Sequence, residues 1–224
     1  MPNRARAREL AAASLRSGDP LGWFERLYQE AERGISEVPW ADLCPNPHLL
    51  AFWKSHPLQA AGKSAVVIGC GLGDDAEQLA TWGFRTTAFD ISETAIRAAR
   101  KRFPESAVES LVADLLAAPA AWLGNFDFVL EVYTLQVLPE NIRPQAIEKI
   151  ARFLRTGGAL LLLARGRDKA DPLAGIPWPL TREELQGFTR AGLQEISFED
   201  YVDRGDEGVR RFRALYSNFS TAMT

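Results

Sequence analysis

A glycine-rich stretch followed by two acids, VVIGCGLGDDAEQLA, is the part of this 224-residue sequence best suited to binding a cofactor. Gly69, Gly71 and Gly73 follow a short apolar run and precede a helical pattern. Glycines let the backbone turn sharply there and let a ligand approach closely. Asp90 ends the next apolar run, 17 residues after Gly73, near the spacing of about 20 residues expected for an acid that binds a ribose. The pattern therefore predicts a nucleotide-type cofactor site.

The charges that follow the glycines distinguish between cofactors. Asp74 and Asp75 open the predicted helix, where a dinucleotide would place its pyrophosphate. A carboxylate facing a phosphate at about 4 Å would cost about 4 kcal/mol at an effective dielectric constant near 20. S-adenosylmethionine carries a sulfonium cation and no phosphate, so these acids favour it over NAD. An NAD-dependent oxidoreductase remains the alternative.

Three motifs between residues 64 and 165 resemble those of class I S-adenosylmethionine-dependent methyltransferases: GCGLGDDA, AFDIS and VADLL. Within that group, the chain resembles the thiopurine, halide and thiol methyltransferases and the tellurite-resistance methyltransferases. This likeness is carried by WFERLYQE, by VPW with Asp42, by GCGLGDD and by FDFVLEVYTLQVLPENIRPQAIEKIARFL. The resemblance implies S-adenosylmethionine as cofactor and a small molecule as methyl acceptor.

The resemblance also implies which residues contact the cofactor. Asp90 would hold the ribose hydroxyls, while Asp114 and Leu115 would meet the adenine. Val67 departs from the family pattern, because many members carry an acid two residues before the first glycine; Asp74, Asp75 or Glu131 would then anchor the cofactor's amino group. A module that binds the cofactor without catalysis is a second alternative. The predicted cofactor-binding residues are Gly69, Cys70, Gly71, Gly73, Asp74, Asp90, Ile91, Asp114, Leu115 and Glu131.

The acceptor site is expected beyond the carboxyl ends of the strands, where open α/β sheets bind their ligands. Glu131 lies at the end of the apolar run 126–132 and Tyr133 follows it; these two are the candidate catalytic residues, with Tyr133 and Gln136 as candidate substrate contacts. A carboxylate ending so apolar a run needs a partner if it is buried. The resemblance adds Trp23 and Trp40 as a lid; core packing of large aromatic side chains is the alternative.

The sequence gives less support for other polar residues as members of the site. His48 and His56 are the only histidines and lie in a proline-rich region, with nothing to place them at the site. The residues Arg165, Arg167, Arg210, Arg211 and Arg213 follow or occupy late strands. Alternate arginines on an edge strand usually protect that edge, and a carboxylate-bearing acceptor is the other interpretation. Without an obvious His/Asp pair, a soft, thiol-like acceptor is slightly preferred, because it needs little help from a base.

Hydrophobic periodicity predicts an α/β fold that positions these residues. It consists of a Rossmann-like, doubly wound sheet, mostly parallel, with an antiparallel C-terminal edge hairpin and an N-terminal helical cap. Residues 1–60 form the predicted extension or lid and 61–224 the cofactor-binding domain. The predicted strands cover 65–69, 85–90, 108–114, 126–132, 159–164, 193–202 and 209–217. The predicted helices cover 74–82, 92–102, 144–154 and 181–191.

Composition excludes several function classes. A net charge of −3 provides no general attraction for nucleic acid. Cys44 and Cys70 are the only cysteines and have no neighbours at metal-ligand spacing, so neither a disulfide framework nor a metal site is expected and a reducing, cytoplasmic setting fits best. No apolar run reaches the roughly 20 residues that span a bilayer, so no membrane association is expected. The arginines among residues 1–19 are also typical of transit peptides; a solvated, partly helical arm is the alternative.

Overall fold

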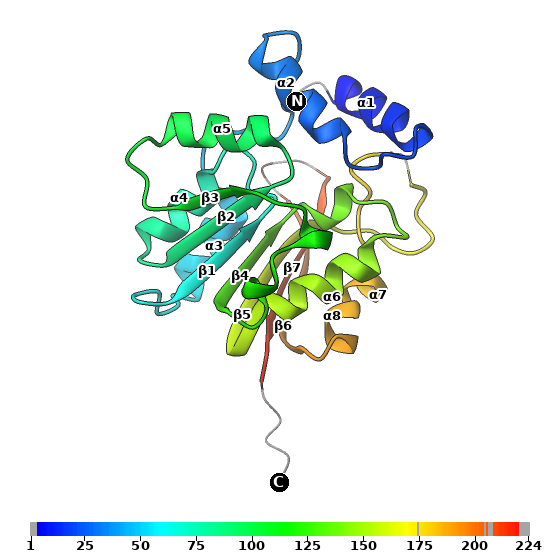
Figure 1. Ribbon diagram of the computed structural model, residues 1–224. Coiled ribbons are helices and arrows are strands. Elements are labelled where there is room, and N and C mark those ends of the chain that lie inside the picture. The colour runs from blue at the N-terminus through cyan, green and yellow to red at the C-terminus, as the bar shows by residue number, and fades with distance from the viewer. Residues whose placement is uncertain (1–3, 174, 204, 206–207, 220–224) are drawn as a thin grey trace. The chain divides into compact units, whose positions relative to one another are not determined.

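The structure is a computed structural model that describes residues 4–173, 175–203, 205 and 208–219. Within these residues, seven strands form one mixed sheet in the order β3-β2-β1-β4-β5-β7-β6 (Figure 1). The strands are β1 (Ser64–Ile68), β2 (Arg85–Asp90), β3 (Glu109–Val112), β4 (Phe126–Val132), β5 (Leu154–Arg165), β6 (Gln194–Val202) and β7 (Arg210–Ser217). This order confirms the predicted Rossmann-like class, with a parallel part and an antiparallel C-terminal hairpin.

Helices connect most of these strands, as a parallel sheet requires. They are α1 (Ala5–Arg16), α2 (Trp23–Glu32), α3 (Pro47–Ser55), α4 (Asp74–Thr81), α5 (Glu93–Arg102), α6 (Arg143–Phe153), α7 (Arg182–Leu185) and α8 (Gly187–Arg190). Short 3₁₀ turns lie at η1 (Leu115–Ala117), η2 (Ala120–Trp122) and η3 (Leu135–Val137).

One compact unit comprises residues 1–62 together with 69–114. In this first unit α1 packs on α2, α2 on α5, and both α4 and α5 on β2, which pairs in parallel with β3. The N-terminal segment is therefore more than a solvated arm: α1 buries Leu10, and the Arg6 Nε donates to a Glu30 carboxylate oxygen at 2.8 Å. The predicted boundary at residue 60 stays a prediction.

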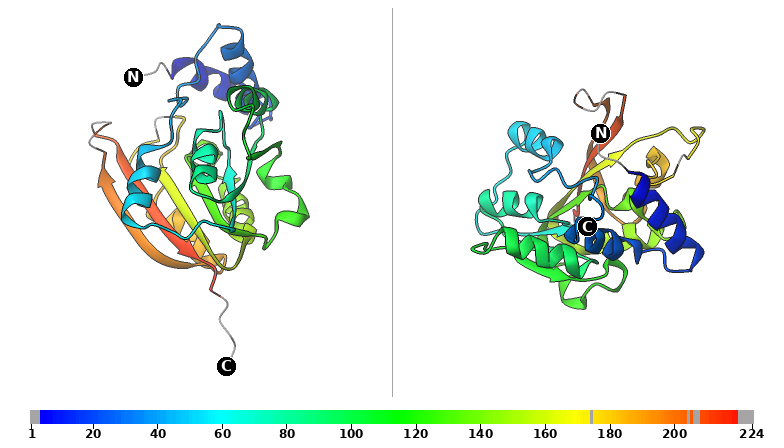
Figure 2. Two further views of the ribbon diagram at one scale, coloured as in Figure 1. Left: turned by 90° about the vertical axis from the view of Figure 1, so that its left-hand side faces the viewer. Right: turned by 90° about the horizontal axis from the view of Figure 1, so that it is seen from above.

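The second unit comprises residues 63–68 and 115–224. Strands β1, β4 and β5 are parallel neighbours, and β5 then pairs antiparallel with β7, which pairs antiparallel with β6. Figure 2 shows β6 and β7 running beside β5. The residues Leu160–Ala164 of β5 are all buried, as the apolar run predicted for a strand covered on both faces.

Two expected boundaries in the second unit were wrong. The strand expected at 159–164 begins at Leu154, so the two glycines lie within β5; a Cβ on Gly158 would lie 2.9 Å from the Phe126 carbonyl oxygen, and the register with β4 shifts at that point. The helix expected over 181–191 divides into α7 and α8 at Gly187. Glycine is a poor helix former, and this one lets α8 approach the Ile147 side chain, which would lie 3.1 Å from an added Cβ.

The interpretation of the late arginines as edge protection was also wrong. Strand β7 lies between β5 and β6 and is therefore not an edge strand. Its arginines face acids of β6 instead: Arg213 is the register partner of Glu199 and pairs with it at 2.6 Å, and Arg210 pairs with Asp200 at 2.7 Å. Such cross-strand charge pairs help to fix the register of the hairpin.

Candidate cofactor-binding and acceptor sites

The glycine-rich turn of the first unit has the left-handed backbone that its composition predicted. The φ angles of Gly69, Gly71 and Gly73 are 60°, 53° and 92°, a region that glycine enters without strain. Gly73 also meets a packing demand, since an added Cβ would lie 3.3 Å from the Ala99 Cβ on α5. The turn therefore cannot carry larger residues at these positions without strain.

Three backbone N–H groups of this turn are already engaged within the protein. The Cys70 amide donates to the Phe89 carbonyl at 2.9 Å, and the Gly73 amide donates to the Cys70 carbonyl at 3.0 Å. The Gly71 amide donates to Asp90 Oδ2 at 2.9 Å. A ligand at this turn therefore cannot use these three donors without displacing their present partners.

Asp90 lies at the end of β2 with its carboxylate held against the glycine-rich turn. In addition to the Gly71 amide, its Oδ1 accepts the Ser92 amide at 2.9 Å. The side chain is 7% exposed, and burial raises the pKa of this carboxyl above its ordinary value. The Ala113 amide donates to the Asp90 carbonyl at 3.0 Å, which brings Asp114 to the same end of β2. Two carboxylate oxygens retain lone pairs for further hydroxyl donors.

The two acids after the turn have partners that the sequence did not reveal. Asp74 receives two hydrogen bonds from the Arg102 guanidinium, at 2.7 and 2.8 Å. Asp75 accepts the Asn46 amide at 2.7 Å, and burial raises its pKa to about 6. Because Arg102 balances the Asp74 charge, repulsion of a phosphate is weaker than the sequence alone indicated. Neither carboxylate remains an obvious anchor for an amino group.

The predicted lid residues belong to an aromatic cluster of the first unit. Trp23 is fully buried and stacks on Phe24, with ring centroids 3.9 Å apart, which favours core packing. Trp40 is 37% exposed, and its indole Nε1 donates to the Tyr28 hydroxyl at 3.1 Å. Tyr28 is buried, and its hydroxyl oxygen lies 3.0 Å from the position that a Cβ on Gly71 would take. The aromatic cluster therefore contacts the glycine-rich turn through Tyr28.

Helix α2 is fastened to the segment after Asp90 by Glu25. This carboxylate accepts the hydroxyl hydrogens of Ser92 and Thr94, each at 2.6 Å, and the Thr94 amide at 3.2 Å. Burial acts to raise the pKa of Glu25, but these hydrogen bonds outweigh it and lower the pKa. An anion at the N-terminus of α5 also complements the helix dipole.

Glu131 is a wholly buried carboxyl in the second unit. It ends β4 beside Ile68, its register partner at the end of β1, after which the chain enters the glycine-rich turn. Its Oε1 accepts the amides of Thr134 and Leu135 at 2.7 and 2.8 Å. Its Oε2 is buried and has no partner among the described residues. Burial raises the pKa of Glu131 to about 7, even though both amides lower it.

The other two acceptor-side candidates differ from each other in the structure. Tyr133 has a φ of 62°, which is uncommon for a residue other than glycine and often accompanies a functional site; the Arg211 guanidinium lies 5.2 Å from its ring centroid. Gln136 is buried, and its side-chain oxygen accepts the Arg165 amide at 2.7 Å. Gln136 therefore holds the last residue of β5, and this contact gives it a structural role.

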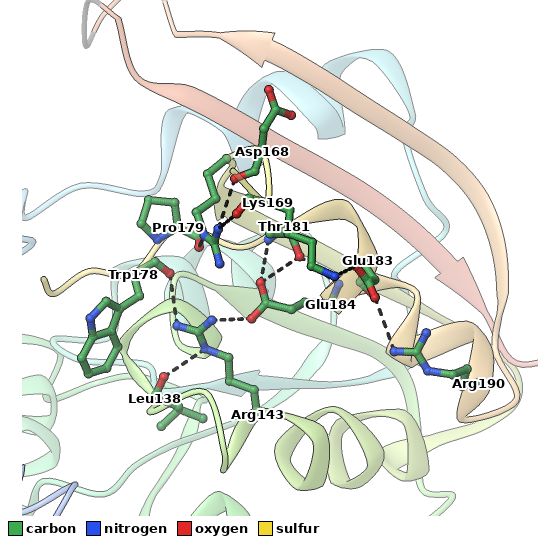
Figure 3. Close-up of polar contacts among 11 residues, drawn as sticks. Leu138, Arg143, Asp168, Lys169, Trp178, Pro179, Thr181, Glu183, Glu184 and Arg190 are labelled. Carbon is green, nitrogen blue, oxygen red and sulfur yellow. Dashed lines mark hydrogen bonds and ion pairs between the residues drawn. The ribbon is translucent and has the colours of Figure 1, made fainter. Parts of the chain in front are cut away.

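Arg143 is the centre of a polar network that the sequence did not single out (Figure 3). It is 3% exposed, donates to the carbonyls of Leu138 and Trp178 at 3.0 and 3.4 Å, and pairs with Glu184. Glu184 in turn accepts the Thr181 amide at 2.7 Å. The network ties η3, α6 and the loop before α7 together. Arg167 serves the same loop, donating to the Pro179 carbonyl at 3.0 Å.

Neither histidine is placed at the glycine-rich turn. His48 lies in the first turn of α3, and His56 follows the end of that helix, where its ring stacks on Phe52. Across the part of the chain that the structure describes, no group of three or more His, Cys, Asp or Glu side chains is arranged to hold a metal ion. Among the described helices, none combines the length and hydropathy of a membrane-spanning segment.

Glu25, Tyr28 and Arg143 were missed at the level of sequence. A signal was available for the first two, because Glu25 and Tyr28 stand three residues apart in WFERLYQE and so share a face of α2 with each other. No comparable signal marked Arg143, because two of its partners, the Trp178 carbonyl and the Glu184 carboxylate, lie 35 and 41 residues away in sequence.

Comparison with known proteins shows what the chain resembles. Residues 65–158 match the family model of a methyltransferase domain. The thiopurine S-methyltransferase of Vibrio atlanticus is 25% identical over 189 residues, which cover 75% of this chain and 84% of that protein. The ubiquinone biosynthesis O-methyltransferase of Xanthomonas oryzae pv. oryzae is 34% identical over 124 residues, covering 53% of this chain and 49% of that protein.

A solved structure agrees with these sequence matches. The 1,6-didemethyltoxoflavin-N1-methyltransferase of Burkholderia thailandensis, with 1,6-didemethyltoxoflavin and S-adenosylhomocysteine bound, has a TM-score of 0.69 and 19% identity. The match covers 98% of this chain and 93% of that one. The likeness to class I methyltransferases, and to thiopurine methyltransferases among them, is thus confirmed. Residues 65–158 thus resemble a methyltransferase domain, and the chain shares its fold with solved methyltransferase structures.

Proposed function

We propose that this protein binds S-adenosylmethionine and transfers its methyl group to a small molecule. The observation that carries the proposal is the Asp90 carboxylate, which is buried against the glycine-rich turn with acceptor capacity left on both oxygens. A carboxylate in this position suits the two hydroxyls of a ribose. When bound, S-adenosylmethionine supplies a methyl group already activated by a sulfonium.

The turn suits this cofactor better than a dinucleotide, and for a reason other than charge. A diphosphate at a glycine-rich turn depends on backbone N–H donors, and the amides of Cys70, Gly71 and Gly73 are engaged within the protein. The family match also disfavours an NAD-dependent oxidoreductase. Asp114 and Leu115 follow β3 and stay candidates for adenine contacts, as does Ile91 after β2.

The burial and the raised pKa of Glu131 support a role for this residue near the methyl acceptor. Its Oε2 is buried and none of the described residues pairs with it, and its raised pKa of about 7 allows it to accept a proton near neutral pH. The slight preference for a thiol-like acceptor depended on the lack of a base, so Glu131 brings hydroxyl and nitrogen acceptors back into consideration. Anchoring of the cofactor's ammonium by the same carboxylate is the other role that an unpartnered oxygen would suit. Tyr133, in its left-handed conformation, stays a candidate contact.

Calorimetric titration with S-adenosylhomocysteine and NAD tests the cofactor assignment. We expect S-adenosylhomocysteine to bind and NAD not to bind. The Asp90→Ala variant should lose about 1.5 to 3 kcal/mol of binding free energy, the usual value of hydrogen bonds to a charged acceptor. Glu105→Ala, which removes an exposed carboxylate from the same unit, should leave the affinity unchanged. Equal affinity in Asp90→Ala and wild type would remove Asp90 from the site.

A transfer assay tests the reaction separately from binding. Radiolabelled S-adenosylmethionine would be incubated with a panel of thiols, phenols, amines and carboxylates, and labelled product would be separated from the cofactor. We expect transfer to at least one small molecule. Binding of the cofactor without transfer to any of them would favour the non-catalytic module instead.

A further inference from the structure

The hydroxyl of Tyr28 is a hydrogen-bond donor without an acceptor among the residues that the structure describes. Its oxygen accepts the indole N–H of Trp40, which fixes one lone pair and leaves the hydroxyl hydrogen available. Of the residues that the structure describes, none accepts a hydrogen bond from it, although the side chain is only 4% exposed. A buried donor without an acceptor costs free energy unless a ligand or water pairs with it.

The place of this donor is the glycine-rich turn. The Tyr28 oxygen lies 3.0 Å from the Cβ position of Gly71, the residue whose amide is engaged by Asp90. Burial, together with the charge of Asp90, raises the pKa of Tyr28 and keeps the phenol in its protonated, donating form. Trp23, in the same aromatic cluster, has an indole N–H that is likewise buried and has no partner in the described part of the chain. The cluster thus offers donors at a turn whose own donors are largely used.

The proposed cofactor has one part that needs such donors. Its ribose hydroxyls can donate to Asp90, but its methionine carboxylate can only accept hydrogen bonds and is repelled by Asp90. The amides of residues 70, 71 and 73 are engaged, so a side-chain donor at this turn offers a carboxylate a partner that these three amides do not supply. The Tyr28 hydroxyl is such a donor in contact with the turn.

We infer, on the basis of the proposed function, that Tyr28 binds the methionine carboxylate of the cofactor through its hydroxyl, with Trp40 orienting the phenol. Tyr28 is a binding residue and Trp40 acts through it as a positioning residue. Glu25, on the same helix as Tyr28, fastens that helix to Ser92 and Thr94 and so keeps the hydroxyl at the turn. The aromatic segment then contributes a specific polar contact rather than only an apolar cover.

A ligand that lacks the carboxylate distinguishes loss of this contact from a structural effect of the Tyr28 substitution. Calorimetric affinities would be measured for S-adenosylhomocysteine and for 5′-methylthioadenosine, which lacks the carboxylate and the amino group. Tyr28→Phe should weaken S-adenosylhomocysteine about tenfold, as expected for one hydrogen bond to a charged group, and leave 5′-methylthioadenosine unchanged. Tyr201→Phe, which removes a hydroxyl from β6, should change neither affinity. Thermal melts would verify that each variant is folded.

A double-mutant cycle with S-adenosylhomocysteine alone provides an independent measurement. Trp40→Phe should also weaken binding, and the double variant with Tyr28→Phe should lose less than the product of the two single factors, because both changes disturb one contact. Equal weakening of both ligands, no weakening by Tyr28→Phe, or fully additive losses would overturn the assignment of Tyr28. Failure of wild type to bind S-adenosylhomocysteine would instead refute the proposed function.

Discussion

The buried carboxyl of Glu131 should make the stability of this protein fall as pH rises toward neutrality. Its side chain is 0% exposed, and burial raises its pKa from 4.5 to about 7. Between these two pH values the unfolded chain has released the proton that the folded chain still holds. The free energy of unfolding therefore decreases with increasing pH over this range, and this stabilising contribution is lost once pH passes the folded pKa.

The shift in the pKa of Glu131 determines how much the free energy of unfolding changes with pH. Each unit of pKa difference corresponds to 1.36 kcal/mol, so a rise from 4.5 to about 7 corresponds to about 3 kcal/mol between pH 4.5 and 8. Glu131→Gln keeps a side-chain oxygen for the amides of Thr134 and Leu135 but has no proton to release. Its absolute stability can differ from wild type, because the new amide N–H₂ also needs partners. The pH dependence is therefore the diagnostic quantity.

Urea denaturation at several pH values between 4.5 and 8 would measure this dependence. We expect the stability of Glu131→Gln relative to wild type to rise by about 3 kcal/mol across the range. Glu148→Gln, an exposed position on α6, should show no such trend. Parallel curves for wild type and Glu131→Gln would refute the reasoning, since they would mean that Glu131 is already ionised in the folded protein at low pH.

Two further variants test the contacts that hold the functional segments in place. Glu25→Gln should lower the free energy of unfolding by about 1 to 3 kcal/mol at neutral pH, because charge-assisted hydrogen bonds from Ser92 and Thr94 are lost; since folding lowers the pKa of Glu25, its contribution in wild type should be present above the unfolded pKa and disappear as pH falls through the folded one. Arg143→Ala should cost about 3 to 5 kcal/mol in chemical denaturation, since Glu184 loses its buried partner. A loss below about 1 kcal/mol would show that water replaces the guanidinium.

The parallel part of the sheet was predictable because its signals are local. Strands β2 and β4 have the predicted bounds, and α5 begins after its predicted cap, where the Ser92 hydroxyl accepts the Ala95 amide. Apolar runs and caps are properties of a few consecutive residues. The order of the last strands and the start of β5 were less accessible, because both depend on pairing between distant segments, such as Gly158 against Phe126.

In the candidate site, too, local features could be predicted from the sequence and long-range contacts could not. The glycines and Asp90 stand at a recognisable spacing, and the structure joins them directly through the Gly71 amide. The roles of Asp74 and Gln136 could not be foreseen, because their partners, Arg102 and the Arg165 amide, lie 28 and 29 residues away in sequence. A charge seen in sequence shows what a residue can offer, and only its neighbours decide whether a ligand can use it.

The contacts of Asp74 and Asp75 change the physical argument for S-adenosylmethionine over NAD. From the sequence, Asp74 and Asp75 disfavour a phosphate by repulsion, yet Arg102 balances the first and the Asn46 amide binds the second. What still disfavours a diphosphate is a shortage of donors within the turn itself, because three of its amides, at positions 70, 71 and 73, are engaged. The same shortage makes the Tyr28 hydroxyl important for any ligand that carries a carboxylate. One set of engaged amides thus accounts both for the preference against NAD and for the need of an aromatic segment that donates a hydrogen bond.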